Sequence, residues 1–160
     1  MTTAFVFGGG GRWGAVEVGM LLALTESGVK PDLIVGSSIG ALNGAATAAD
    51  PTHAGALRLQ RTWSGLRDSD LFDSSLVGRL RTMGRQRIAL HRTSELRHVI
   101  EGFLGAARFD ELEVPFQCVA ASIERAAEHW FSSGPLVEAI LASAAVPGLF
   151  PPVRIGDESY

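Results

Sequence analysis

Residues 32–45 have the sequence DLIVGSSIGALNGA, and this stretch indicates both the fold and the chemistry of the chain. The apolar run Leu33–Val35 is typical of a buried strand, and the small residues over Ile39–Ala49 predict a helix directly after it. Between them, Gly36-Ser37-Ser38-Ile39-Gly40 forms a G-x-S-x-G motif at the turn from strand to helix. That context is typical of a nucleophile elbow, in which the flanking glycines allow a sharp, strained turn.

Ser38 lies at the centre of this turn and is the candidate catalytic nucleophile. The turn is expected to expose its hydroxyl at the carboxyl edge of the sheet, facing the N-terminus of the following helix. The positive end of the helix dipole favours the oxyanion that forms when a hydroxyl attacks a carbonyl. Ser37 lies one position off the apex and is expected to point elsewhere. The alternative is a structural turn of small residues.

A second glycine-rich turn, Gly8-Gly9-Gly10-Gly11-Arg12-Trp13-Gly14, follows an expected strand over Ala4–Phe7 and precedes a helix over Ala15–Glu26. One interpretation is a dinucleotide-binding fingerprint, because Gly9, Gly11 and Gly14 satisfy G-x-G-x-x-G. That fingerprint requires an acidic residue at the end of the second strand, whereas Asp32 precedes that strand.

The other interpretation is an oxyanion hole. Backbone N–H groups of Gly9, Gly10 and Gly11 would face the substrate oxygen above Ser38. In a parallel sheet both turns lie at the same edge, so they can form one site. The pairing of the two motifs is more specific than either motif alone.

The order strand, helix, strand, helix predicts an α/β fold with a mainly parallel sheet. Residues 51–92 predict short helices and loops. Beyond them we expect a helix behind a cap at Thr93 and Ser94, strands over Val114–Ser122 and His129–Ser132, a helix over Leu136–Ser143, and a hairpin turn at Gly156-Asp157-Glu158.

Composition indicates one globular domain over residues 1–160, with 46% hydrophobic and 19% charged residues. A net charge of −3 gives no electrostatic case for nucleic acid. The single cysteine, Cys118, excludes an internal disulfide and suits a reducing, cytoplasmic environment. No secretory signal or apolar run of about 20 residues is present, so any membrane contact is expected to be peripheral.

Three stretches resemble the patatin-like phospholipase family in their order and spacing: FGGGGRWGAVEVGMLLAL (7–24), KPDLIVGSSIGALNGA (30–45) and ILASAAVPGLFPPV (140–153). The resemblance covers most of the chain and weakens over residues 51–92. It implies a three-layer α/β/α sandwich with a mainly parallel sheet. It also implies a lipid acyl hydrolase with a Ser-Asp dyad and no catalytic histidine. No metal or organic cofactor is expected, because the glycine loop lacks a phosphate-binding Lys and the sequence has no clustered metal-ligand motif.

Carried over by position, the resemblance makes Ser38 the nucleophile. It assigns the glycine loop to Gly9, Gly10, Gly11 and Gly14, and the elbow glycines to Gly36 and Gly40. The stretch from Ser143 to Pro147 matches the family's S-x-A-x-P sequence, which packs near the site.

Two positions depart from the family pattern. The family usually has Arg or Lys directly before the last glycine of the first motif, where this chain has Trp13, so the resemblance assigns no anion-binding role to Arg12.

The second departure concerns the dyad aspartate, which belongs to a D-G-G or D-G-A motif that is expected beyond Tyr160. We therefore expect a patatin-like domain that is incomplete at its C-terminus, with little activity in these 160 residues alone. Asp157 falls in the preceding hairpin turn and is not taken as the base.

The remaining charged and titratable side chains have plainer explanations. His53, His91, His98 and His129 are interpreted as surface or packing residues. An arginine cluster could contact lipid phosphates, although a solvated connector is favoured. The cluster comprises Arg79, Arg81, Arg85, Arg87, Arg92 and Arg97.

The sequence therefore predicts a serine esterase that acts on phospholipids, lysophospholipids or other fatty-acyl esters. A non-catalytic lipid- or protein-binding module on the same fold is the alternative. A nucleotide-binding domain is a third hypothesis.

Overall fold

A four-stranded sheet organises the chain, with its strands in the order β1 (Ala4–Phe7), β2 (Leu33–Ser37), β3 (Phe116–Ser122) and β4 (Ala127–Phe131). The computed structural model describes residues 2–65, 85–104, 107–147 and 150–160, with the backbone alone for 85–92. The first three strands are parallel, and β4 pairs antiparallel with β3. The predicted α/β class with a mainly parallel sheet is confirmed.

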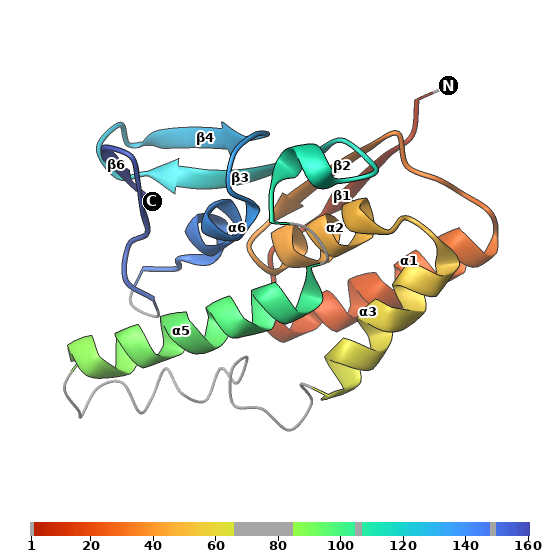
Figure 1. Cartoon of the computed structure of the whole chain (residues 1–160), viewed down its shortest axis with the longest axis horizontal. Coiled ribbons are helices and arrows are strands. Elements are labelled where there is room, and N and C mark those ends of the chain that lie inside the picture. Colours follow the sequence, from red (N-terminus) through yellow and green to blue (C-terminus); the bar gives the residue numbers. More distant parts are fainter. Residues whose placement is uncertain (1, 66–84, 105–106, 148–149) are drawn as a thin grey trace.

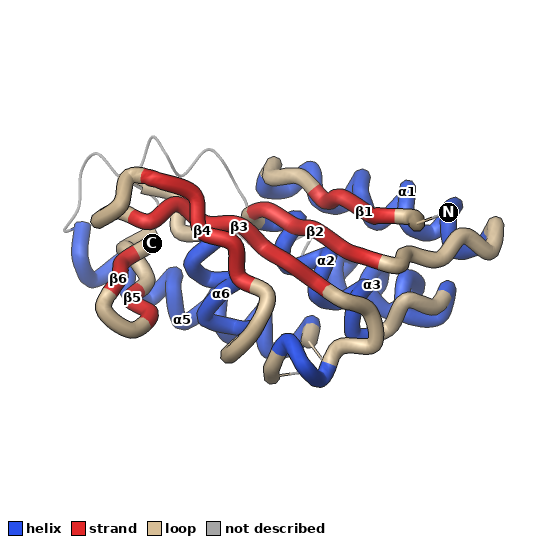
Figure 2. The backbone as a smooth tube through the Cα atoms, turned by 90° about the horizontal axis from the view of Figure 1, so that it is seen from above, coloured by secondary structure: helices blue, strands red, loops and turns tan. Residues whose placement is uncertain are grey.

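The α-helices form two tiers on one face of the sheet (Figures 1 and 2). In the first tier, α2 (Ile39–Ala49) packs against β1, β2 and β3, and α6 (Leu136–Ala144) packs against β3. In the second tier, α5 (Arg85–Phe103) contacts α6 and α2, while α1 (Gly14–Glu26) packs against α2 and α3 (His53–Gly65). Within the described residues, the two tiers together correspond to one of the two helical layers of the expected three-layer sandwich.

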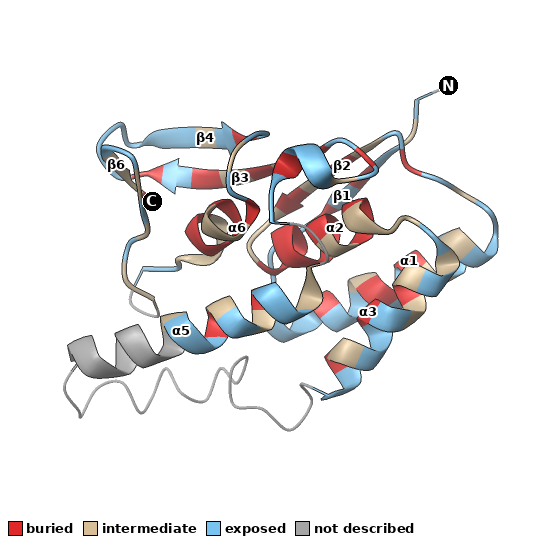
Figure 3. Ribbon diagram, in the orientation of Figure 1, coloured by how far each residue is buried: buried red, intermediate tan, exposed pale blue. Residues whose placement is uncertain are grey.

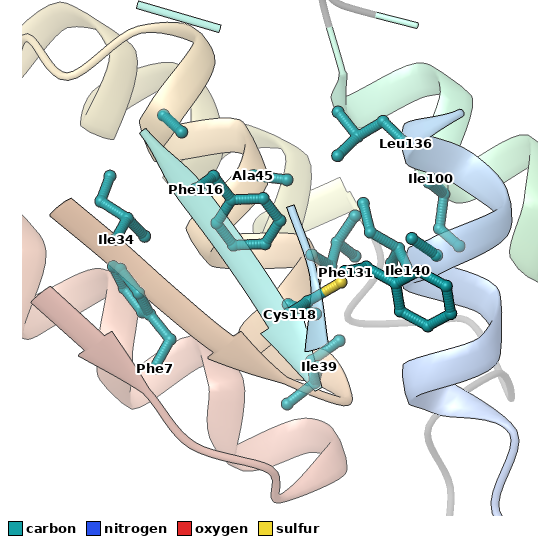
Figure 4. Close-up of a cluster of buried hydrophobic side chains, with 14 of the residues drawn as sticks. Phe7, Ile34, Ile39, Ala45, Ile100, Phe116, Cys118, Phe131, Leu136 and Ile140 are labelled. Carbon is teal, nitrogen blue, oxygen red and sulfur yellow. The ribbon is translucent and has the colours of Figure 1, made fainter. Parts of the chain in front are cut away.

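The core lies between the sheet and the first helical tier. Side chains of β1 alternate, because successive residues of a strand point to opposite faces: Phe5 and Phe7 are buried and Val6 is exposed. Figure 4 shows Phe7, Ile34, Phe116 and Cys118 pointing from the strands towards the helices. Figure 3 shows the same division, since α2 is almost entirely buried and the outer surfaces of α1, α3 and α5 are exposed.

Within the region 51–92, the described residues 51–65 and 85–92 are more regular than the sequence suggested, and the prediction for residues 66–84 lies outside the described part of the chain. Residues 53–65 form the single continuous helix α3, whereas short helices and loops were expected. The expected cap at Thr93 and Ser94 is wrong, because α5 begins at Arg85 and runs through both residues. Thr costs little inside a helix whose apolar stripe packs against a neighbour, so tertiary contact outweighs the local capping signal.

A small hairpin closes the described chain, with β5 (Arg154–Ile155) paired antiparallel to β6 (Glu158–Ser159). It docks on the turn between β3 and β4, where Ile123 N–H donates to the Ser159 carbonyl at 2.8 Å. Glu158 pairs with Arg125 and accepts a hydrogen bond from Ser122 Oγ. The Arg125 guanidinium lowers the pKa of the Glu158 carboxyl. The predicted hairpin turn is therefore confirmed.

Candidate active site

Ser38 adopts a backbone conformation that serine rarely occupies. Its φ is 54° and its ψ is −122°, and among the described residues only Ala126 shares a positive φ without being glycine. The residue sits at the N-cap position of α2, where a serine hydroxyl commonly caps the helix. Its side chain makes no capping hydrogen bond. The half-buried hydroxyl is therefore not committed to holding the helix start.

The two elbow glycines allow the turn by keeping backbone atoms in close approach. A Cβ on Gly36 would lie 2.5 Å from the Gly40 carbonyl oxygen, and a Cβ on Gly40 would lie 2.5 Å from the Gly8 carbonyl oxygen. Real Cβ atoms do not approach backbone oxygens so closely, so any side chain at either position would push the turn apart. The G-x-S-x-G spacing thus has a steric cause in this fold.

The glycine loop lies directly against the elbow. Phe7, the last residue of β1, is opposite Gly36 in the parallel ladder, so both turns leave the sheet at the same edge, as predicted. A Cβ on Gly9 would lie 3.5 Å from Ser38 Cβ. Gly11 has a φ of 56° and starts a 3-10 turn, η1 (Gly11–Trp13). Gly8 to Gly11 are all exposed above the half-buried serine.

Gly14 has a different environment from the other loop glycines. It is buried at the first position of α1, and a Cβ there would lie 2.8 Å from both Ile39 Cγ1 and Trp63 Cζ2. Its backbone N–H bonds within the η1 turn. Gly14 therefore lets α1 pack closely on α2 and α3, and its amide is already paired.

Ser143, near the end of α6, fixes the backbone of the elbow. Its Oγ accepts a hydrogen bond from the Ser38 N–H at 2.8 Å and donates one to the Val119 carbonyl at 2.7 Å. Val119 is opposite Ser37 in the sheet. One hydroxyl thus joins α6, β3 and the elbow. The sequence placed the stretch beginning at Ser143 near the site through the family resemblance, but it gave this side chain no role.

A buried asparagine on α2 ties the start of α1 to the same region. Asn43 Nδ2 donates to the Gly14 carbonyl at 3.0 Å and to Glu17 Oε2 at 2.8 Å. Its Oδ1 accepts a hydrogen bond from Trp63 Nε1 at 2.9 Å. Sequence reasoning missed this network, although a lone amide within a run of small, apolar residues was a signal for it.

The structure separates several other residues from the elbow. Asp32 bonds to Thr3 at the opposite, amino end of the strands, which counts against a dinucleotide site. His53 Nδ1 lies 3.0 Å from Thr25 Oγ1, one helix length from the glycine loop. His129 packs against Phe131.

Further predicted surface groups have the following positions. His98 is exposed on α5, and Arg97 pairs with Glu138. Arg79 and Arg81 lie outside the described residues, as do the side chains of Arg85, Arg87, His91 and Arg92. Arg12 is exposed, with its guanidinium 5.9 Å from the centre of the Trp13 ring.

Two other types of site find no support in the described part of the chain. Burial raises the pKa of the Cys118 thiol to about 12, so the cysteine remains protonated and unreactive. The described ranges contain no group of three or more His, Cys, Asp and Glu residues arranged to hold a metal ion. None of their helices has both the length and the hydrophobicity required to cross a bilayer.

Comparison with known families gives one match that spans nearly the whole chain. Residues 5–160 match the family model described as patatin-like phospholipase. An uncharacterised NTE family protein of Mycobacterium bovis is 29% identical over 156 residues, covering 95% of this chain and 39% of that protein. Lysophospholipase nte1 of Aspergillus terreus is 28% identical over 164 residues, covering 95% of this chain and 10% of that protein.

A third relative, neuropathy target esterase sws of Drosophila sechellia, is 28% identical over 151 residues. The match covers 92% of this chain and 10% of that protein. The chain therefore spans less than half the length of each of these relatives.

Solved structures share the fold at low sequence identity. VipD from Legionella pneumophila aligns with a TM-score of 0.66 at 14% identity, covering 99% of this chain and 45% of VipD. ExoU of Pseudomonas aeruginosa, in its complex with SpcU, aligns with a TM-score of 0.58 at 17% identity, covering 94% of this chain and 39% of that chain.

Proposed function

Because the chain belongs to the patatin-like phospholipase family, we propose that it is the catalytic part of a lipid acyl hydrolase with Ser38 as its nucleophile. The observation that carries the proposal is the positive φ of Ser38. Its hydroxyl makes no capping hydrogen bond to α2, and the residue lies beside a loop of four glycines. Its substrates are phospholipids, lysophospholipids or other fatty-acyl esters. The names of the fungal and insect relatives, a lysophospholipase and an esterase, support this substrate class.

In the first step, Ser38 Oγ attacks the acyl carbonyl carbon. A new Oγ–C bond forms, the carbonyl oxygen takes up negative charge, and the serine proton passes to a general base. Collapse of this intermediate breaks the ester C–O bond, and the base returns the proton to the departing alcohol. Water, deprotonated by the same base, then hydrolyses the acyl-enzyme and restores the serine.

The oxyanion is held by backbone amides. Gly9, Gly10 and Gly11 form the exposed loop against Ser38, and the positive N-terminus of α2 points into the same region. The Ser38 amide is not among the donors, because it is already bonded to Ser143 Oγ. The Gly14 amide is excluded for the same reason, since it bonds within the η1 turn.

The general base is an aspartate beyond residue 160, as the family resemblance implies. A serine hydroxyl is a weak nucleophile without such a partner, and general-base assistance contributes about 10²–10⁴-fold in rate. Residues 1–160 alone are therefore expected to hydrolyse esters poorly, and the test requires the full-length gene product.

The test is hydrolysis of p-nitrophenyl butyrate and of a phospholipid by the full-length protein. Ser38→Ala is expected to reduce kcat by at least about 10³-fold. Ser37→Ala is the matched control, because it removes a hydroxyl from the adjacent residue at the end of β2. It should retain most of the activity.

Equal loss of activity in both variants, or activity that survives Ser38→Ala, would contradict the assignment of Ser38. A folded full-length protein that hydrolyses none of these esters would favour the alternative of a non-catalytic lipid- or protein-binding module.

A further inference from the structure

Helix α1 and the residue at its N-cap, Trp13, carry a row of exposed apolar side chains on one side. Trp13, Val16, Met20 and Leu24 have exposed fractions of 66%, 54%, 60% and 40%. Spacings of three, four and four residues bring these positions to one side of a helix. We call these four residues the α1 stripe. At 1.5 Å per residue it extends about 16 Å along the helix axis.

Between Gly14 and Leu24, no exposed position beside the stripe carries a charge. The remaining exposed positions between Gly14 and Leu24 are small, namely Ala15, Gly19 and Ala23. Glu17, the only carboxylate in that span, is partly buried and accepts the hydrogen bond from Asn43. The opposite side, with Val18 and Leu21, is buried against the protein. A helix with apolar side chains on both sides is typically covered on both sides by protein or lipid.

The stripe begins at the candidate active site. Trp13 belongs to the same 3-10 turn as Gly11, and its N–H donates to the Gly10 carbonyl at 3.2 Å. The neighbouring Gly9 lies against Ser38. A surface that covered the stripe would therefore meet the protein at the glycine loop, where an ester must approach the serine.

Charge at the start of α1 indicates what covers the stripe. Arg12 is exposed and lies over the Trp13 ring, whereas beyond the end of the helix Lys30 and Asp32 are both exposed and have opposite charges. Glu26 lies on the other side of the helix by its spacing from the stripe. Tryptophan and basic side chains beside an apolar helix face are the combination found in helices that lie in the interface of a membrane with anionic lipids.

We propose that the α1 stripe docks on an anionic lipid surface and so presents the glycine loop and Ser38 to ester bonds in that surface. The proposal rests on the proposed function for its substrate class. It adds a docking surface and an orientation in which α1 lies in the plane of the membrane. It also separates activity on soluble esters, which does not require docking, from activity on vesicles, which does.

The experiment uses Ser38→Ala full-length protein, so that vesicle lipids remain intact and binding is measured without hydrolysis. Phosphatidylcholine vesicles with and without phosphatidylserine, each containing brominated acyl chains, quench tryptophan fluorescence where a ring enters the bilayer. The chain provides its own control, because Trp130 is also exposed (47%) but lies on β4, at the far edge of the sheet from β1 (Figure 1). Trp63 is buried.

We expect quenching by the phosphatidylserine vesicles that is lost in Trp13→Phe and retained in Trp130→Phe. The double change Met20→Ser and Leu24→Ser should strongly reduce co-sedimentation with these vesicles. Ile123→Ser removes a similarly exposed side chain (58%) from the turn after β3 and should leave co-sedimentation unchanged. Circular dichroism would establish that each variant is folded.

The proposal is wrong if neither kind of vesicle binds, or if quenching survives Trp13→Phe and disappears with Trp130→Phe. It is also wrong if the Met20 and Leu24 changes leave vesicle binding intact but dissociate a dimer in size-exclusion chromatography, since the stripe would then be a protein interface. Loss of the proposed function would appear separately, as the absence of Ser38-dependent hydrolysis in a protein that still binds vesicles.

Discussion

At the scale of single residues, Ser38 combines a reactive side chain with a costly backbone conformation. A non-glycine residue with φ of 54° and ψ of −122° costs about 1–3 kcal/mol relative to a relaxed conformation. The Ser143 hydrogen bond and the close approach at Gly36 and Gly40 hold it there. Backbone strain at one position is thus maintained by contacts from α6, β2 and α2.

This strain predicts different stabilities for two substitutions at residue 38. Ser38→Gly should be more stable to thermal unfolding than Ser38→Ala, by about 1 kcal/mol, because glycine adopts positive φ without strain. Both variants should lack esterase activity. Differential scanning calorimetry makes the comparison, and equal stability of the two variants would show that the backbone at this position is not strained.

A second prediction concerns Ser143 as a positioning residue. Ser143→Ala leaves the half-buried Ser38 N–H without its partner, which costs less than the ~1–3 kcal/mol of a fully buried donor. We expect kcat to fall about 10-fold with little change in KM, because the elbow shifts while the exposed glycine loop remains. Ser143→Thr keeps the hydroxyl and should restore most of kcat. A change confined to KM, or to stability alone, would argue against positioning.

The sequence predicts a catalytic role for Ser38 and assigns none to Ser143, for a physical reason. The sequence signal for Ser38 is local, since glycines two positions away on each side make the turn possible. The hydrogen bond between Ser38 and Ser143 joins residues 105 positions apart. It depends on how α6 approaches β3, which no short stretch of sequence encodes.

At the scale of elements, the glycines of α1 and α2 have different functions despite similar helical settings. Gly40, in the first turn of α2, faces the Gly8 carbonyl oxygen, whereas a Cβ on Gly19 in α1 would have no atom within 4 Å. One glycine is required by a close backbone approach. The other has open space beside it.

Alanine substitutions should separate these two cases. Gly40→Ala is expected to destabilise the protein by about 3 kcal/mol or more, because backbone must move to admit the methyl group. Gly19→Ala should stabilise it by about 0.5–1 kcal/mol, since alanine favours the helix more than glycine does. Chemical denaturation measures both. A small loss of stability in Gly40→Ala would contradict the close packing of the glycine loop on α2.

Element boundaries show where local signals are sufficient. The helix α2 begins and ends where its sequence predicted, because an apolar strand precedes it and Asp50-Pro51 follows it. The start of α5 was missed, because Thr93 and Ser94 resemble a cap but lie inside a longer helix. Buried Leu96 and Ile100 give α5 the contacts that override this signal.

At the scale of the whole molecule, the sheet is completed by residues far apart in the sequence. The third strand, β3, starts at Phe116, well after β2, and its partner β4 runs antiparallel to it. The sequence predicted these strands and the parallel character of the sheet. It did not give the direction of β4 or the placement of the described α-helices on one face, because both depend on packing.

Cys118 provides a probe of this whole arrangement. It lies opposite Gly36 in the centre of the sheet, and burial raises the pKa of its thiol to about 12. The thiol should react with an aromatic disulfide reagent at pH 8 only as fast as the protein unfolds. Stability should also decline above pH 9, because the unfolded chain then loses the thiol proton that the folded state retains. Rapid reaction in native buffer would show that the sheet centre is open.

The central claim, that Ser38 is the nucleophile, is tested most directly by covalent trapping. The full-length protein is treated with a fluorophosphonate, which reacts with activated serines, and the modified residue is located by peptide mass spectrometry. We predict a single adduct on Ser38 that is absent in Ser38→Ala and retained in Ser37→Ala. An adduct on another residue, or none in a protein that hydrolyses esters, would contradict the account.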